Sequence, residues 1–117
     1  MKKNRPEIGT TLWSVHEHLY YIPGRAAPVK EYCVCESQVR NYIEGNFIQI
    51  VLVGKGPDGY TELHYFKLSE LGKCVFFNPR EAAELAKQVT EKYEQTWGWT
   101  GDPPLRRTWE KYLQQES

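Results

Sequence analysis

The chain has 117 residues, of which 26% are charged and 40% hydrophobic, and its 15 Lys and Arg residues balance its 15 Asp and Glu residues. This length predicts a single domain, 1–117, and the composition is that of a folded protein rather than a disordered one. The neutral balance gives no overall attraction to nucleic acid, and no apolar run approaches the roughly 20 residues that a membrane-spanning helix needs.

The cysteines and the amino terminus indicate the compartment. Three cysteines without a regular spacing argue against a secreted disulfide scaffold. The opening stretch MKKNRPEIG is basic, but no apolar segment follows it, so no secretory signal is predicted. We therefore expect a cytoplasmic protein with reduced thiols and no membrane association.

The first region, 8–77, has the pattern of short strands separated by turns. Alternating β-forming residues and Gly/Pro punctuation predict strands at 10–18, 29–43, 47–54, 60–68 and 74–77. The second strand is long and is expected to bend near Ser37. KGPDG at 55–59 is the strongest turn signal, because proline presets one turn dihedral and glycine accepts the positive one.

The third predicted strand, 47–54, is apolar on both faces. Phe47, Val51 and Val53 alternate with Ile48, Ile50 and Leu52. A strand with two apolar faces must be covered on both sides. We expect the strands to curl around one face and a helix to cover the other.

A helix is predicted at 78–98. Asn78 is a suitable N-cap, Pro79 suits the first helical position, and Glu81 completes a capping box, while Gly98 is a suitable stop. One helical stripe is apolar: Ala82, Leu85, Ala86, Val89, Tyr93 and Trp97.

The rest of the chain, 99–117, is a Trp/Arg-rich tail that holds a short helix. The predicted fold is therefore α+β. It consists of a small SH3-like five-stranded antiparallel barrel, or a strongly bent sheet, followed by a carboxy-terminal helix and a short helical tail.

The stretch LGKCVFFNPREAAELA, after an IGTTLW opening strand, carries a resemblance. It is similar to the motif GKTVFLTREEAE that ends a small β-domain in uncharacterised SH3-like β-barrel proteins of Firmicutes and their prophages or conjugative elements. The matching residues are Gly72, Lys73, Val75, Phe76, Pro79, Glu81 and Ala82. The resemblance spans roughly residues 8–90 and implies a small-barrel fold and a mobile-element or gut-bacterial origin. It brings no catalytic residues.

Metal-ligand side chains occur in two closely spaced pairs, Cys33 with Cys35 and His16 with His18. Zinc would need the two pairs to converge. Strand alternation puts both thiols on the apolar face with Val39, where they act as small core residues. If Trp13 points inward on the first strand, the two histidines lie on the other side. We therefore expect no metal and no cofactor.

The sequence also lacks the elements of an active site. A core thiol has no neighbouring base to activate it, and Cys74 is no better placed. His64 is expected to be a partly buried, hydrogen-bonded residue. Since no G-x-S-x-G, phosphate loop or H-E-x-x-H occurs, we expect no enzymatic activity.

The remaining feature is an aromatic and basic cluster near the carboxy terminus, composed of Trp97, Trp99, Arg106, Arg107, Trp109 and Tyr112. Tryptophan and arginine are enriched at binding hot spots, so these residues are candidate partner contacts. The competing interpretation is that they pack the tail back onto the barrel.

Two functions follow from this cluster. The first is a protein-interaction module, encoded by a phage or another mobile element, with inhibition of a host protein such as a defence nuclease as its narrower form. The alternative is a nucleic-acid-binding accessory protein, in which Trp stacks on bases and Arg meets phosphates. The sequence identifies neither the partner nor the oligomeric state, although an exposed sheet edge could pair with a second copy.

Overall fold

A computed structural model describes residues 5–56, 59–96 and 107–114. The elements in chain order are β1 (Thr11–Tyr20), β2 (Val29–Glu44), β3 (Ile48–Lys55), β4 (Thr61–Lys67), the 3-10 turn η1 (Leu68–Glu70), β5 (Val75–Phe76), α1 (Pro79–Thr96) and α2 (Glu110–Leu113). All five predicted strands are confirmed to within two residues at each end. The start of the main helix and the short helix of the tail are confirmed as well.

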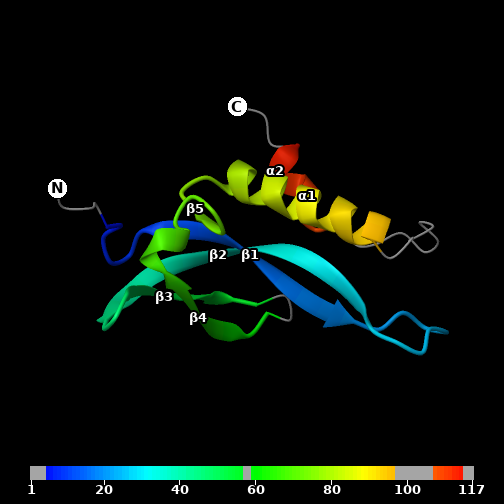
Figure 1. Cartoon of the computed structure of the whole chain (residues 1–117), viewed down its shortest axis with the longest axis horizontal. Coiled ribbons are helices and arrows are strands. Elements are labelled where there is room, and N and C mark those ends of the chain that lie inside the picture. Colours follow the sequence, from blue (N-terminus) through cyan, green and yellow to red (C-terminus); the bar gives the residue numbers. More distant parts are fainter. Residues whose placement is uncertain (1–4, 57–58, 97–106, 115–117) are drawn as a thin grey trace.

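The strands form one antiparallel sheet in the order β4-β3-β2-β1-β5. Figure 1 shows β3 and β4 curled beneath the long β1–β2 ribbon, with both helices on its other side. The sheet is strongly curled. Among the described strands β4 and β5 are its two edges, so the hydrogen-bonded ladder does not close into a barrel. The predicted α+β class, with a five-stranded antiparallel sheet followed by helices, is confirmed.

The curl of β2 has a local cause. The pairing of β2 with β3 shifts register between Val39 and Asn41, so Arg40 is an extra residue that bends the strand. The irregularity therefore lies at Arg40 and not at Ser37. Ser37 is instead the first residue of β2 with a partner on β3, so the first half of β2 pairs only with β1.

The inner, concave face of the sheet holds the main apolar core. Its fully buried members are Leu12, Val39, Ile50, Leu52, Leu68 and Val75. They come from four strands and from η1, which closes one end of the curl. Burial of this kind stabilises a fold by about 1.5–3 kcal/mol per large aliphatic side chain.

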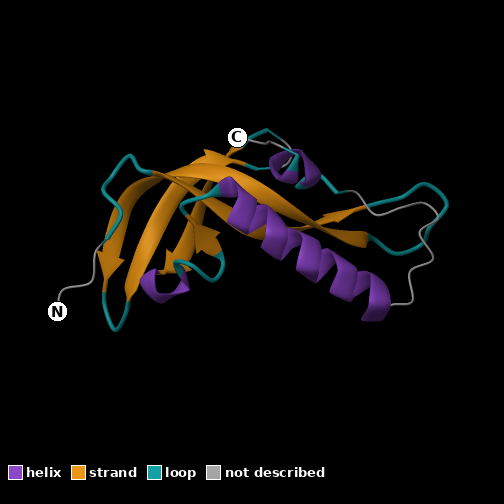
Figure 2. Ribbon diagram, turned by 90° about the horizontal axis from the view of Figure 1, so that it is seen from above, coloured by secondary structure: helices purple, strands orange, loops and turns teal. Residues whose placement is uncertain are grey.

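Helix α1 packs on the outer face of the sheet, as Figure 2 shows from above. Its N-cap is as predicted, since the backbone N–H of Arg80 donates to Asn78 Oδ1 at 2.7 Å. Ala83 and Ala86 pack against Val15 and Val34 of β1 and β2. The prediction that the helix mainly covers the third strand is therefore wrong: the helix lies over β1, β2 and β5.

The buried stripe of α1 is also displaced from the predicted one. Its buried residues are Ala82, Ala83, Ala86 and Thr90. Thr90 is buried because the returning tail covers it.

In the described part of the chain, no helix combines the length and apolar character needed to cross a bilayer.

Candidate functional site

The predicted partner-binding residues divide into two groups. Trp97, Trp99 and Arg106 lie outside the described residues. Nη2 of Arg107 donates to both carboxylate oxygens of Glu94 on α1, at 2.9 Å to Oε1 and 2.7 Å to Oε2. Trp109 is only 3% exposed, and its indole N–H donates to Thr90 Oγ1 at 3.2 Å. Tyr112 packs against the apolar cluster that Trp109 forms with Ala83 and Ala86 of α1. The described part of the tail therefore packs back onto the fold, so Trp109 would have to leave its place to meet a partner.

Exposed apolar side chains lie on the outer face of the sheet, beyond the strands β1, β2 and β5 that α1 contacts. This surface, which we call the outer patch, consists of Ile43, Phe47, Leu63 and Tyr65, each 40–53% exposed. Tyr65 pairs with Val51 of β3, and Val51 pairs in turn with Asn41 of β2, two residues before Ile43. Sequence reasoning missed the patch because it assigned the helix to this face. The alternation of Leu63 and Tyr65 in the fourth strand was the available indication.

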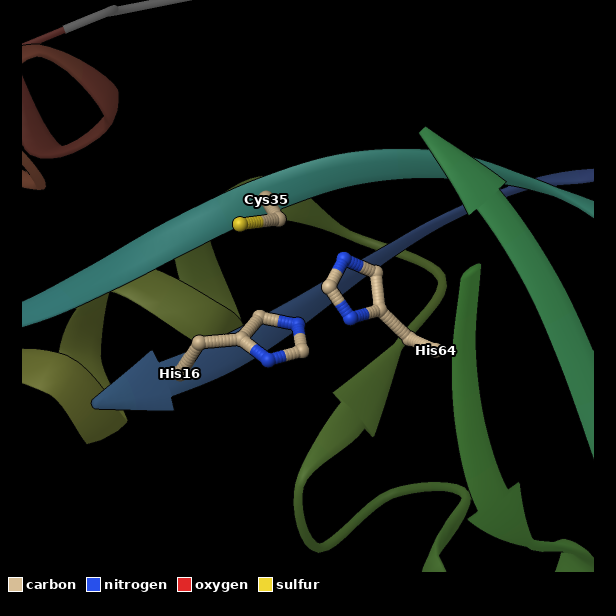
Figure 3. A group of neighbouring side chains, drawn as sticks. All are labelled: His16, Cys35 and His64. Carbon is tan, nitrogen blue, oxygen red and sulfur yellow. The ribbon is translucent and has the colours of Figure 1, made fainter. Parts of the chain in front are cut away.

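The concave interior brings a different set of residues together. Side chains of His16, Cys35 and His64 converge from β1, β2 and β4, as Figure 3 shows. One ligand-type atom from each lies within 4.8 Å of the other two. Since β1 and β4 are not neighbours in the sheet, only its curl makes this meeting possible.

The prediction that the histidines and thiols face apart is wrong. The β1–β2 ladder sets Ser14 opposite Cys35 and His16 opposite Cys33, and paired residues share a face of a sheet. The error has a physical reason. Both faces of β1 are covered, so the apolar Val15 lies under α1 while His16 points into the curl.

The two imidazole rings are in direct contact. Their centroids are 4.1 Å apart with an interplanar angle of 39°. Ser14 Oγ hydrogen-bonds Nε2 of His16 at 2.7 Å, and Oε1 of Glu62 lies 3.5 Å from Nε2 of His64. The cluster therefore has oxygen groups beside both rings.

Burial keeps two of these groups uncharged. It lowers the pKa of His16 to about 4, and the neighbouring His64 acts in the same direction. Burial also raises the pKa of Cys35 to about 12, with contributions from Cys33 and Glu62. At neutral pH the site thus presents a neutral imidazole and a protonated thiol. A protonated thiol is a poor nucleophile, so the arrangement does not favour cysteine catalysis.

A pocket of about 270 Å³ opens beside the thiols. It lies at the edge of β2 that β3 no longer covers, and its lining includes Cys33, Cys35 and Gly56. Both thiols are buried, yet this pocket brings the surface of the molecule next to them.

No family model matches the chain, and no curated protein or solved structure matches it. The resemblance to small β-barrel proteins of Firmicutes therefore stays a prediction.

Proposed function

We propose that the protein is a non-enzymatic protein-interaction module that binds a partner along β4 and the outer patch. The observation that carries this proposal is the position of β4. It is an edge strand of seven residues whose outward side chains include Leu63 and Tyr65. An edge strand offers unpaired backbone groups to an incoming strand, and adjacent apolar side chains add contact area.

The location of this surface differs from the one that the sequence indicated. Trp109 and Arg107 are engaged with α1, whereas the outer patch combines aromatic and aliphatic side chains that helix α1 leaves open. Tyr and Phe are common at the centres of protein interfaces. Lys67 lies 4.9 Å from the ring centroid of Phe47 and gives the patch a cationic border.

The nucleic-acid alternative has less support. Several basic side chains of the described residues lie within 4.0 Å of a carboxylate: Arg5 with Glu44, Lys30 with Glu17, Arg80 with Glu84, and Arg107 with Glu94. Such pairing reduces the positive field that phosphate binding needs. We therefore keep protein binding as the proposal.

We also propose that the curled sheet belongs to the SH3-like class of small barrels. The strand order, the return of β5 to β1 and the 3-10 turn before β5 support it. Mobile-element origin and inhibition of a defence nuclease rest on the resemblance alone.

The test uses a tagged protein and two matched double variants. Leu63→Glu with Tyr65→Glu puts charge on the outer patch. Leu19→Glu with Tyr21→Glu makes the same two changes at apolar residues near the end of β1 that are more exposed than Leu63 and Tyr65. Proteins captured from a bacterial lysate by the wild type are identified, and each is then purified for direct measurement of its Kd.

A true partner should bind the wild type and the β1 variant equally and the outer-patch variant at least about tenfold more weakly, equivalent to about 1.4 kcal/mol. Circular dichroism checks that both variants fold. Equal binding by all three forms would rule out the outer patch, and loss with both variants would indicate nonspecific apolar adhesion.

A further inference from the structure

We propose that His16, Cys35 and His64 bind one zinc-like divalent ion inside the curled sheet. The site is separate from the outer patch and does not depend on the proposed function. It links three strands, and two of them, β1 and β4, share no ladder of hydrogen bonds in the described sheet. The ion would join β4 to β1 across the interior of the curl.

The donor set fits zinc and related metals. Imidazole nitrogen and cysteine thiolate are the ligands that Zn²⁺ and Co²⁺ prefer, whereas Mg²⁺ and Ca²⁺ select oxygen. The Cys35 thiol would therefore release its proton to solvent as the ion binds. A tetrahedral zinc with bonds of about 2.1 Å to nitrogen and 2.3 Å to sulfur holds its ligand atoms about 3.4–3.7 Å apart. The three atoms here already lie within 4.8 Å of one another. Small side-chain rotations therefore suffice to close the site.

The polar atoms around the cluster also point to a ligand. Nε2 of His64 is buried and makes no hydrogen bond within the described part of the chain, and the same holds for Ser37 Oγ on the same face of β2. Buried polar atoms nearly always have a partner, so an orphaned imidazole nitrogen beside a second histidine and a thiol needs an explanation. An ion that accepts the imidazole lone pair provides one.

Glu62 completes the surroundings. Its Oε1 is 3.5 Å from Nε2 of His64, and a Cβ built on Gly56 would lie only 2.4 Å from the Glu62 carboxylate. The missing side chain at Gly56 thus leaves room for that carboxylate. This carboxylate lies beside Nε2, the nitrogen that we assign to the ion, so it is placed to fill a fourth position on the ion. There it would offset the charge of the metal.

The site also has a route to solvent. The pocket at the free edge of β2 reaches Cys35 past Gly56 and Lys55. A buried metal site requires an entry path. This pocket provides one, because an ion can approach the thiol without unfolding of the sheet.

Cobalt titration of the whole chain tests the proposal, because Co²⁺ reports its ligands by absorption. Equimolar Co²⁺ should produce the visible bands of a tetrahedral ion together with a thiolate-to-cobalt charge-transfer band. Zn²⁺ should displace it, and native mass spectrometry should count one ion per chain. A wild type that shows no charge-transfer band overturns the proposal.

Variants identify the ligands. Cys35→Ala should abolish the charge-transfer band, and His64→Ala should weaken Co²⁺ binding by about 100-fold or more, since changes to outer-shell groups alone cost 10–100-fold. The controls are Cys74→Ala and His18→Ala, a thiol and an imidazole outside the cluster, and both should bind as the wild type does.

Loss of binding in the controls, or normal binding by both ligand variants, contradicts the assignment. If Cys35→Ala does not fold, the wild type carries the test alone. Bound Co²⁺ should then protect Cys35 from a thiol reagent, as peptide mapping measures, and an unchanged labelling rate counts against the site.

Discussion

The concave face of the sheet has an apolar end and a polar end, and the same strands build both. At the apolar end β1, β2 and β4 contribute Leu12, Val39 and Phe66. A few residues along each strand they contribute His16, Cys35 and His64. Because alternate residues share a face, each strand changes from apolar to polar along one continuous surface.

The two ends differ in the kind of side chain that they bury. The fully buried side chains of the apolar end are all aliphatic, so none of them needs a hydrogen bond. The polar end completely buries Ser14, which bonds to the imidazole of His16, and the boundary between the two ends completely buries Ser37. Aliphatic residues there would stabilise the fold more, so the polar residues indicate a role other than packing.

Truncating a core side chain in metal-free protein should cost much more at the apolar end than at the polar end. Leu12→Ala should lower the free energy of unfolding by about 2–5 kcal/mol, because it leaves a cavity in the dry core. Cys35→Ala should lower it by only about 1 kcal/mol, since the thiol is a small hydrophobe. Urea unfolding with a chelator present measures both. Equal losses would mean that the two ends pack alike.

The boundary between the two ends gives the second prediction. A Cβ at Gly54 would lie 2.3 Å from Ser37 Oγ and 2.6 Å from the carbonyl oxygen of Glu36, so β2 and β3 would have to separate. Gly54→Ala should therefore destabilise the protein by about 1–3 kcal/mol.

Gly45→Ala is the matched control, because nothing lies within 4 Å of its Cβ position and its φ is not positive. Thermal unfolding of the two variants makes the comparison. A similar change in Tm for both would show that the close approach at Gly54 carries no energetic weight.

The sequence predicted the elements of this fold well. Local signals define them: alternation for the strands, KGPDG for a turn, and Asn78 with Pro79 for the start of α1, whose cap contact is present. Such signals depend only on neighbours in the chain. The placement of α1 over β1 and β2 was not predictable in this way, because Val15 and Val51 look equally suited to lie under a helix.

The interior cluster was out of reach for a related reason. Periodicity shows that Cys33 and Cys35 share a face, but it does not say which face of β1 meets them. That choice depends on the pairing of His16 with Cys33. The approach of His64 depends on the curl of the whole sheet, to which the extra residue Arg40 contributes.

Acid should weaken the polar end of the metal-free protein. The folded pKa of His16 is about 4, below the ordinary value of 6.5, so between these values the unfolded chain binds more protons. The stability that neutral His16 provides is full above about pH 6.5 and is lost as the pH falls toward 4.

Between pH 7 and pH 5 this loss should amount to about 1–2 kcal/mol in the free energy of unfolding. Urea unfolding at several pH values measures it, and His16→Leu supplies the comparison because it removes the titrating group. Glu62 and His64 face the same space and are retained in both proteins. A variant with the same pH slope as the wild type would refute the role of His16.

Two buried serines, Ser14 at the polar end and Ser37 at the boundary, should differ in what their hydroxyls contribute to stability. Ser14 Oγ bonds to His16, so Ser14→Ala should cost about 1 kcal/mol. Ser37 Oγ makes no hydrogen bond within the described residues, so Ser37→Ala removes a buried hydroxyl that gains nothing from the fold. It should be neutral or stabilise the protein by up to about 1 kcal/mol. Urea unfolding of metal-free protein compares the two, and a loss at Ser37 equal to that at Ser14 would mean that an enclosed water satisfies its hydroxyl. The polar end would then be hydrated throughout, and the contrast between the two ends would be one between a wet and a dry interior.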